Sequence, residues 1–295
     1  MVESEIVIRP ASEVPRAAFV RALNAAYSDY YVPIFMTPRS FNEMARRESV
    51  RLECSAAAVR GKQIVGLGLL GVRGKRGWIG GMGVIPSFRG RGIGRRIMEY
   101  LLERARRLGL RDIQLEVITR NKPAFQLYRS LGFEVRRRLL VLSRESALLH
   151  PDSPASSDVL IRSRSPSLLI DDLARLPGVP RPWQREEAAL RLVLKNLKGL
   201  EALHPEGGDR TGVCLYATSS YHLGLFDLAA ESEEVGEALL ATVLGKYPLA
   251  RASYLNVAEN DPMLPVLRAA GFRETLSQFE MHLSRVSDTQ DDREI

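Results

Sequence analysis

The sequence predicts a mixed α/β fold that occurs twice along the chain, and three observations lead to that prediction. Strand-type and helix-type patterns alternate through the first half, a segment of the second half repeats that outline, and a Ser- and Pro-rich stretch over residues 143–158 separates the halves. The length of 295 residues also suits two domains. We expect a first domain over 1–145, a linker over 146–158, a second domain over 159–285 and a flexible tail over 286–295.

The elements of the first half are expected from local patterns taken in chain order. A short strand over Ile6–Arg9 precedes a helix from Ser12 to Tyr27, for which Ser12 is the expected N-cap. Gly61 and Lys62 suit a hairpin turn. The other expected elements are a helix over 40–49, strands over 56–60, 64–72 and 78–85, a helix over 91–108, a strand over 113–118, a helix over 123–131 and a strand over 133–142.

An internal repeat accounts for the second half of the chain. Residues 115–133 match residues 255–272 once a single residue is deleted ahead of an Asn. Both segments then run from a strand to Asn, to Pro two residues later, to a short helix and to Gly-Phe, with identical spacing from Asn to Gly. Because solenoids need more than two copies, the repeat indicates a tandem duplication.

Charge is distributed unevenly between the halves. Residues 1–150 carry 27 Lys and Arg against 13 Asp and Glu, whereas residues 151–295 carry 15 against 22. A basic half suggests an anionic partner, either a nucleic acid or a phosphorylated cofactor. Nucleic acid is the less expected of the two, because no helix-turn-helix or zinc signature is present.

Cysteine usage and hydropathy restrict the cellular setting. Cys54 and Cys214 lie far apart without metal-type spacing, so we expect buried thiols in a reducing compartment and no metal site. No run of about 18 apolar residues occurs, and the acidic N-terminus is unlike a signal peptide. We therefore expect a cytoplasmic protein with no membrane partner.

A Gly- and Arg-rich loop connects the strand expected before residue 85 to the long helix that follows. Glycines at positions 90, 92 and 94 would let backbone N–H groups approach an anion closely. The first turn of the helix adds unpaired N–H donors and a favourable dipole. A pyrophosphate suits this loop, with Arg89, Arg91 and Arg95 supplying positive charge around it.

Three kinds of phosphate loop compete for this segment. A Walker loop needs Gly-Lys-Ser/Thr, and a dinucleotide fingerprint needs G-x-G-x-x-G, and neither spacing is present. Arg89-Gly90-Arg91-Gly92-Ile93-Gly94 instead resembles the Q/R-x-x-G-x-G/A pyrophosphate loop of the GNAT superfamily of N-acyltransferases. Downstream, residues 121–133 reproduce the N-x-x-A-x-x-L-Y-x-x-x-G-F pattern of that family's second cofactor motif.

The resemblance implies a fold, a co-substrate and site residues. It implies two tandem GNAT-like domains, each a mixed, mostly antiparallel sheet flanked by helices, and the segments NAAYSDYYVP and RPWQ also resemble a tandem branch of the family. Acetyl-CoA is the implied co-substrate. Met82 and Val84 would pair with its pantetheine arm through their backbone, and Asn121 would contact the same arm unless it serves only as a helix N-cap.

Tyr128 matches the family's general acid, which protonates the departing thiolate. On its position alone it would be a core aromatic of an amphipathic helix, and the surrounding motif favours the acid role. The general base stays open. Many relatives place a Glu on the fourth strand, where this chain has Gly80 and Gly81. Glu116, directly or through a water, and more weakly Asp29 are the candidates, and Glu116 suits a solvated strand position equally well.

The second copy lacks these chemical groups. Leu267 stands where Tyr128 stands in the first copy, and an acidic segment that includes Glu231, Glu233 and Glu234 replaces the Arg-Gly loop. Carboxylates there would repel a pyrophosphate, so one active site per chain is expected. The second domain would then complete a sheet, form a wall of the acceptor pocket or attract a cationic amine.

The expected function is transfer of an acetyl group from acetyl-CoA to an amine by direct attack in a ternary complex. The alternative is a non-catalytic CoA-binding regulatory module. Small amines, aminoglycosides, peptide N-termini and protein lysines all remain open as acceptors, and so does the choice between a monomer and a homodimer.

Overall fold

The computed structural model describes residues 5–146, 159–204 and 208–284, so nearly all of the expected linker and the whole expected tail lie outside the described residues. The chain divides into two compact units, one made of residues 1–136 and 280–295 and the other of residues 137–279. The division falls within strands β8 (Glu134–Arg144) and β14 (Arg273–Ser284), each of which contributes to both units.

The first unit contains four α-helices and the first strands of the chain, with two short 3-10 turns, η1 (Ala11–Glu13) and η2 (Pro86–Phe88). The helices are α1 (Arg16–Ala26), α2 (Pro38–Arg47), α3 (Ile93–Arg107) and α4 (Lys122–Ser130). The strands are β1 (Ile6–Pro10), β2 (Ala56–Arg60), β3 (Gln63–Gly68), β4 (Leu70–Arg73), β5 (Arg76–Ile79), β6 (Gly83–Val84) and β7 (Asp112–Ile118).

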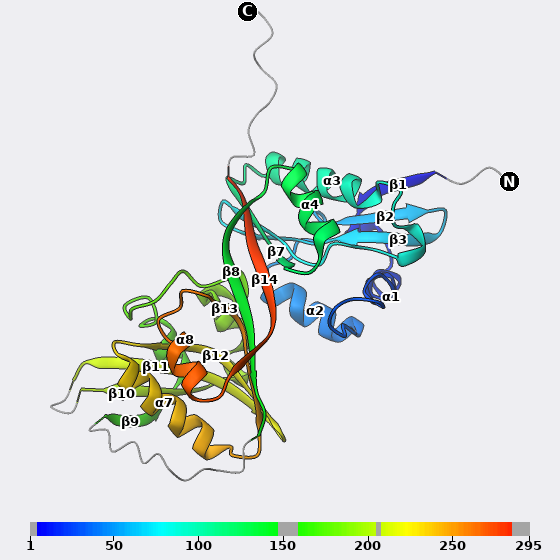
Figure 1. Cartoon of the computed structure of the whole chain (residues 1–295). Coiled ribbons are helices and arrows are strands. Elements are labelled where there is room, and N and C mark those ends of the chain that lie inside the picture. Colours follow the sequence, from blue (N-terminus) through cyan, green and yellow to red (C-terminus); the bar gives the residue numbers. More distant parts are fainter. Residues whose placement is uncertain (1–4, 147–158, 205–207, 285–295) are drawn as a thin grey trace, which may run out of the picture. The chain divides into compact units, whose positions relative to one another are not determined.

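The strands of the first unit run in the orders β1-β2-β3-β6 and β4-β5-β7, with β14 beside β7. β5 and β7 pair in parallel, whereas β1 with β2, β2 with β3, β3 with β6 and β4 with β5 pair antiparallel. Helices cover opposite faces of the β1–β3 region (Figure 1). A Cβ built at Gly66 or Gly68 would lie 2.9 or 2.7 Å from Ile97 of α3, whereas Leu67 and Leu69 pack with α1 and α2.

The strand expected over residues 78–85 is interrupted, and this part of the prediction is wrong. β5 pairs with β7, but β6 pairs with β3, so the chain changes partners between Ile79 and Gly83. Gly81 has a φ of +81° at the break, a conformation that glycine adopts without steric cost. The two paired segments therefore diverge at residues 80–82.

Two expected helix starts are also wrong. Ser12 lies in η1 and caps no helix, because Pro15 biases Val14 toward its extended conformation and α1 begins only at Arg16. The long helix begins at Ile93, two residues later than expected, since Gly90 and Gly92 both have positive φ values.

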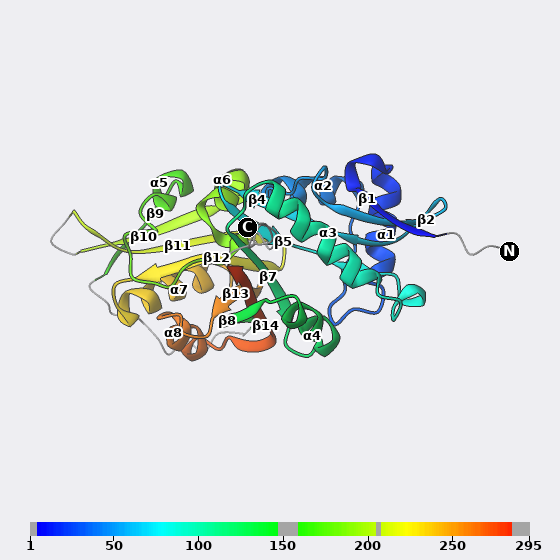
Figure 2. The same ribbon diagram turned by 90° about the horizontal axis from the view of Figure 1, so that it is seen from above.

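The second unit is built around β9 to β14, with strands in the order β8-β13-β12-β11-β10-β9 and β14 beside β8. Helices α5 and α6 cover one face and α7 and α8 the other (Figure 2). The strands are β9 (Leu160–Arg164), β10 (Lys198–Leu203), β11 (Arg210–Ser219), β12 (His222–Ala230) and β13 (Arg251–Ala258). The helices are α5 (Pro166–Ile170), α6 (Glu187–Val193), α7 (Glu233–Lys246) and α8 (Leu264–Ala269), with 3-10 turns η3 (Trp183–Arg185) and η4 (Leu194–Asn196).

The internal repeat extends to the backbone of both units. Gly132 and Gly271 have φ values of +89° and +90° after their helices. The N–H of Phe133 donates to the carbonyl of Tyr128 at 3.1 Å, and the N–H of Phe272 donates to that of Leu267 at 3.0 Å. Each unit also has one parallel strand pair, β5 with β7 and β12 with β13. The mixed α/β fold is thus confirmed. None of the helices in the described ranges is long and apolar enough to cross a membrane.

Candidate functional site

The loop before α3 has the backbone of an anion-binding site. Gly90 and Gly92 have φ values of +76° and +73°, and a Cβ at either position would meet no atom within 4 Å. Gly92 is the N-cap of a 15-residue helix and offers no side-chain oxygen. Within the described ranges, the N–H groups of Ile93, Gly94 and Arg95 donate to no backbone carbonyl. These donors and the helix dipole favour a bound anion.

Arg89 fixes this loop to the C-terminal end of α1. Its two terminal nitrogens each donate to a carboxylate oxygen of Asp29 at 2.7 Å. It also donates to the carbonyls of Ala26 and Val84, both at 3.0 Å. The hydrogen bonds from Arg89 hold the pKa of Asp29 below its usual value, which makes this carboxylate a poor proton acceptor.

Arg91 and Arg95 lie beside the same glycines. The guanidinium of Arg91 stacks 5.5 Å from the ring centroid of Phe88 and donates to the carbonyl of Ser87. Arg95, in the first turn of α3, donates to the hydroxyl of Ser130 at 2.6 Å. Both side chains therefore keep positive charge around the N-terminus of α3.

Strand β6 ends its sheet, since β3 is its single neighbour in the part of the chain that the structure describes. Its remaining edge is available to an added extended segment. The carbonyls flanking that edge already accept one bond each, that of Met82 from the hydroxyl of Tyr27 at 3.1 Å and that of Val84 from Arg89. A carbonyl has a second lone pair, so both remain able to accept from a ligand.

Tyr128 lies on α4 and is 6% exposed. Its ring packs against Phe133 with centroids 6.1 Å apart, and its hydroxyl donates to no other group in the described residues. Burial, with a smaller contribution from the nearby Tyr30, raises the pKa of Tyr128. The hydroxyl therefore stays protonated at physiological pH and is able to donate that proton.

Asn121 caps α4, because its side-chain oxygen accepts from the N–H of Ala124 at 3.3 Å. The N-cap role considered from the sequence is thus present. Asn121 also joins the tyrosines that follow α1. Burial raises the pKa of Tyr30, while a hydrogen bond with Asn121 opposes that change.

Three tyrosines pack together at and after the C-terminal end of α1. The rings of Tyr27 and Tyr30 meet edge to face at 4.8 Å, and those of Tyr30 and Tyr31 at 5.4 Å. The hydroxyl of Tyr31 donates to the carbonyl of Arg120 at 3.2 Å. Sequence reasoning noted this Tyr-rich segment but did not connect it to Met82 or Arg120, since those contacts span 55 and 89 residues.

Glu116 lies on β7 and is half-buried. The indole N–H of Trp78 donates to its carboxylate at 2.8 Å. A Cβ at Gly80 would overlap the six-membered ring of Trp78, so the indole covers the strand position at which relatives carry a Glu. Trp78 is a residue that sequence reasoning missed, because only the strand register shows what its side chain reaches.

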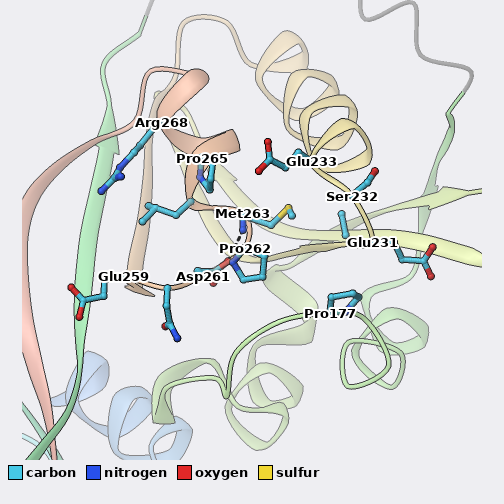
Figure 3. A pocket seen from close by; sticks show the side chains of 13 residues that line it. Pro177, Glu231, Ser232, Glu233, Glu259, Asp261, Pro262, Met263, Pro265 and Arg268 are labelled. Atoms are coloured by element: carbon cyan, nitrogen blue, oxygen red, sulfur yellow. Dashed lines mark hydrogen bonds between the residues drawn. The ribbon is translucent and has the colours of Figure 1, made fainter.

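The second unit contains a cavity of about 540 Å³ at the position that corresponds to the cofactor motif (Figure 3). Residues at the start of α7 and the start of α8 line it. Its lining residues include four with carboxylates and one cation, Arg268; the four are Glu231, Glu233, Glu259 and Asp261. Burial raises the pKa of Asp261 against the hydrogen bond that it accepts from the N–H of Met263.

The α7 terminus differs from that of α3 in its capping. The hydroxyl of Ser232 accepts from the N–H of Val235 at 3.3 Å, so one of the first donors is already used. Leu267, at the place of Tyr128, is fully buried. Neither the charge nor the capping of this terminus suits a pyrophosphate.

Residues 19–133 match the Acetyltransferase (GNAT) family. The matched residues lie in the first unit, which is therefore the part of the chain that is similar to this family. N-alpha-acetyltransferase RimI of Mycobacterium tuberculosis is 46% identical to this chain over 69 residues, which are 22% of this chain and 42% of that protein. The chain spans less than half the length of each curated relative that it matches.

Solved structures match nearly the whole chain. A GCN5-related N-acetyltransferase from Sphaerobacter thermophilus has a TM-score of 0.72 at 17% identity over 95% of each chain. A tandem GNAT protein from the clavulanic acid biosynthesis pathway has a TM-score of 0.69 at 16% identity, over 96% of this chain and all of that one. These likenesses confirm the tandem GNAT fold.

Proposed function

We propose that this protein is an N-acetyltransferase that moves the acetyl group of acetyl-CoA to an amine. The observation that carries the proposal is the start of α3, where two positive-φ glycines and unpaired N–H groups meet positive side chains. The pyrophosphate of acetyl-CoA binds to Gly90, Gly92, Ile93 and Gly94 through the backbone.

Each remaining residue has a role that follows from its surroundings. Arg91 and Arg95 supply charge to the pyrophosphate, while Arg89 holds the loop against α1 through Asp29. The pantetheine arm adds to the edge of β6 at Met82 and Val84 and lies near Asn121.

The chemistry is a direct attack in a ternary complex. Glu116, directly or through a water, removes the proton that keeps an ammonium acceptor unreactive. The amine nitrogen then forms a bond to the thioester carbon, and the carbon–sulfur bond breaks. Tyr128 gives its proton to the sulfur, and the proton that the amide nitrogen loses restores the Tyr128 hydroxyl through solvent. Glu116 returns its proton to solvent, and acetylated amine and free CoA thiol result.

Two measurements test the proposal. Acetyl-CoA should raise the melting temperature of the full chain by binding its native state, and thiol release should follow when amines are added. A suitable panel holds spermidine, glucosamine, an aminoglycoside and a peptide with a free N-terminus, the last because RimI, to which the chain is similar, is an N-alpha-acetyltransferase.

The outcomes separate the candidates. No thermal shift at millimolar acetyl-CoA would exclude both the enzyme and a CoA-binding regulatory module. A shift without thiol release from any amine would favour the regulatory module. One bound acetyl-CoA per chain by calorimetry is expected, since the second unit has an acidic, capped helix start.

A further inference from the structure

Strand register brings Trp78 to the same face as Glu116. In the parallel pair of β5 and β7, Trp78 is opposite Gln114 and Ile79 is opposite Leu115, and the pairing ends there. Side chains alternate along a strand, and therefore Trp78, Gln114 and Glu116 share one face. Leu115 points to the other face, and it is 1% exposed.

Trp78 occupies the space that a side chain at residue 80 would fill. Its ring covers Gly80 so closely that a Cβ there would overlap it, and its indole N–H reaches the carboxylate of Glu116 at 2.8 Å. Trp78 itself is 7% exposed, so neighbouring side chains restrict its ring. The absence of a side chain at Gly80 is what allows the indole to reach Glu116.

A rigid donor fixes the position of a glutamate. It limits the rotamers of a flexible side chain, which keeps the carboxylate in one position relative to a bound amine. This fixed position would help Glu116 to act as a base.

We propose that Trp78 is a positioning residue that holds Glu116 for proton removal, and that Gly80 is required because it leaves room for the indole. The carboxylate of Glu116 thus acts from β7, and β5 contributes the Trp78 indole that orients it. This inference rests on the proposed function, in which Glu116 receives the amine proton.

A double-mutant cycle on kcat tests the proposal, with thiol release from acetyl-CoA and the best amine of the panel. Glu116→Gln should lower kcat by about 100-fold, a typical effect of losing a general base. Trp78→Phe keeps an aromatic ring but no N–H, and should lower kcat roughly 10-fold with the KM for acetyl-CoA unchanged. The double variant should be no slower than Glu116→Gln, because Trp78 acts through Glu116.

Gly80→Ala should also lower kcat, as Trp78→Phe does, since the added Cβ displaces the indole. Trp183→Phe is the matched control for loss of a buried indole, because Trp183 is fully buried in the second unit. It should lower the melting temperature and leave kcat unchanged. Full kcat in Trp78→Phe, or losses that add in the double variant, would overturn the inference.

A readout without activity checks the contact itself. The chain has two tryptophans, so a nitrogen-15 spectrum shows two indole N–H signals that Trp78→Phe assigns. Glu116→Gln should move the Trp78 signal and leave that of Trp183 in place, and an unmoved Trp78 signal would refute the contact. Acetylation that persists in Glu116→Gln would refute the base and this inference together, yet leave the acetyltransferase proposal intact.

Discussion

Trp78 of the first unit pairs with Gln114 as Leu225 of the second pairs with Tyr254, and the repeat aligns Glu116 with Asn256. Two residues after these pairs, the first unit has Gly80 and Glu116, whereas the second has Asp227 and Asn256. Each copy therefore has one carboxylate among these residues, but on different strands.

The second unit uses its polar groups for its own contacts. Arg181 binds both carboxylate oxygens of Asp227 at 2.6 and 3.1 Å, and Gln184 accepts from Asn256 at 3.1 Å. The segment that ends in η3 thus supplies hydrogen-bond partners to both Asp227 and Asn256. In the first unit the hydroxyl of Tyr128 has no such contact within the described residues. The two copies therefore share a backbone, but the polar groups of the second copy hydrogen-bond to one another, whereas, in the described part of the chain, the Tyr128 hydroxyl of the first does not.

The largest expected effect is on the acid. Tyr128→Phe should lower kcat by about 100- to 10,000-fold, the range for loss of a general acid, because the thiolate must then leave unprotonated. Calorimetry should show unchanged affinity for acetyl-CoA. Leu267→Met, at the equivalent place in the second unit, is the control and should keep full activity. Full activity in Tyr128→Phe would show that the hydroxyl, which Leu267 lacks in the second unit, is not needed for catalysis.

The next effect concerns stability in the second unit. Asp227 is 2% exposed, and Asp227→Ala leaves Arg181 without its partner, which should cost about 3 kcal/mol of unfolding free energy. Denaturant titration measures that cost. The activity of the folded fraction should not change, and a loss of kcat greater than the loss of folded protein would give the second unit a part in the chemistry.

A smaller effect is expected at the glycine loop. Gly92→Ala forces a side chain into φ +73°, which costs about 1–2 kcal/mol, so acetyl-CoA should bind roughly 10-fold more weakly. Ser232→Gly at the equivalent helix start should change stability by only a few tenths of a kcal/mol and leave acetyl-CoA affinity unaltered. Isothermal titration distinguishes these results. Equal losses in both variants would contradict the one-site assignment.

The smallest expected effect is on the free energy of unfolding, and it concerns His282 near the C-terminal end of β14. Nδ1 of His282 lies 3.0 Å from Asp112 and Nε2 lies 3.2 Å from Glu280. Burial lowers the pKa of His282, but the hydrogen bonds with Glu280 and Asp112 outweigh it and the net change is upward. A raised folded-state pKa gives stability that is complete below the unfolded value of about 6.5 and is lost as pH rises through the folded value.

His282→Gln should therefore destabilise the protein more at pH 5.5 than at pH 9, by about 1 kcal/mol, the scale of a hydrogen bond to a charged group. Urea titrations at the two pH values measure the difference. Asp112→Asn should reduce the same pH dependence. A cost of His282→Gln that is independent of pH would show that the imidazole contributes by packing alone.

Some of this molecule could be predicted from its sequence, and the rest depends on contacts between distant residues. The tandem fold followed from the spacing shared by residues 115–133 and 255–272, and the Asn121 cap followed from local helix chemistry. The break at residues 80–82 could not be predicted, because it depends on β5 and β6 pairing with different strands, β7 and β3. The Arg89–Asp29 pair joins residues 60 positions apart, and no local pattern indicates it.

Strand β14 begins in the second unit and ends in the first, and this has a consequence for the order of folding. Residues 280–284 belong to the first unit, yet they follow the whole second unit in the chain. During synthesis, the first unit therefore lacks the strand beside β7 until every residue of the second unit has been made. The unit that carries the GNAT motif begins first and is completed last.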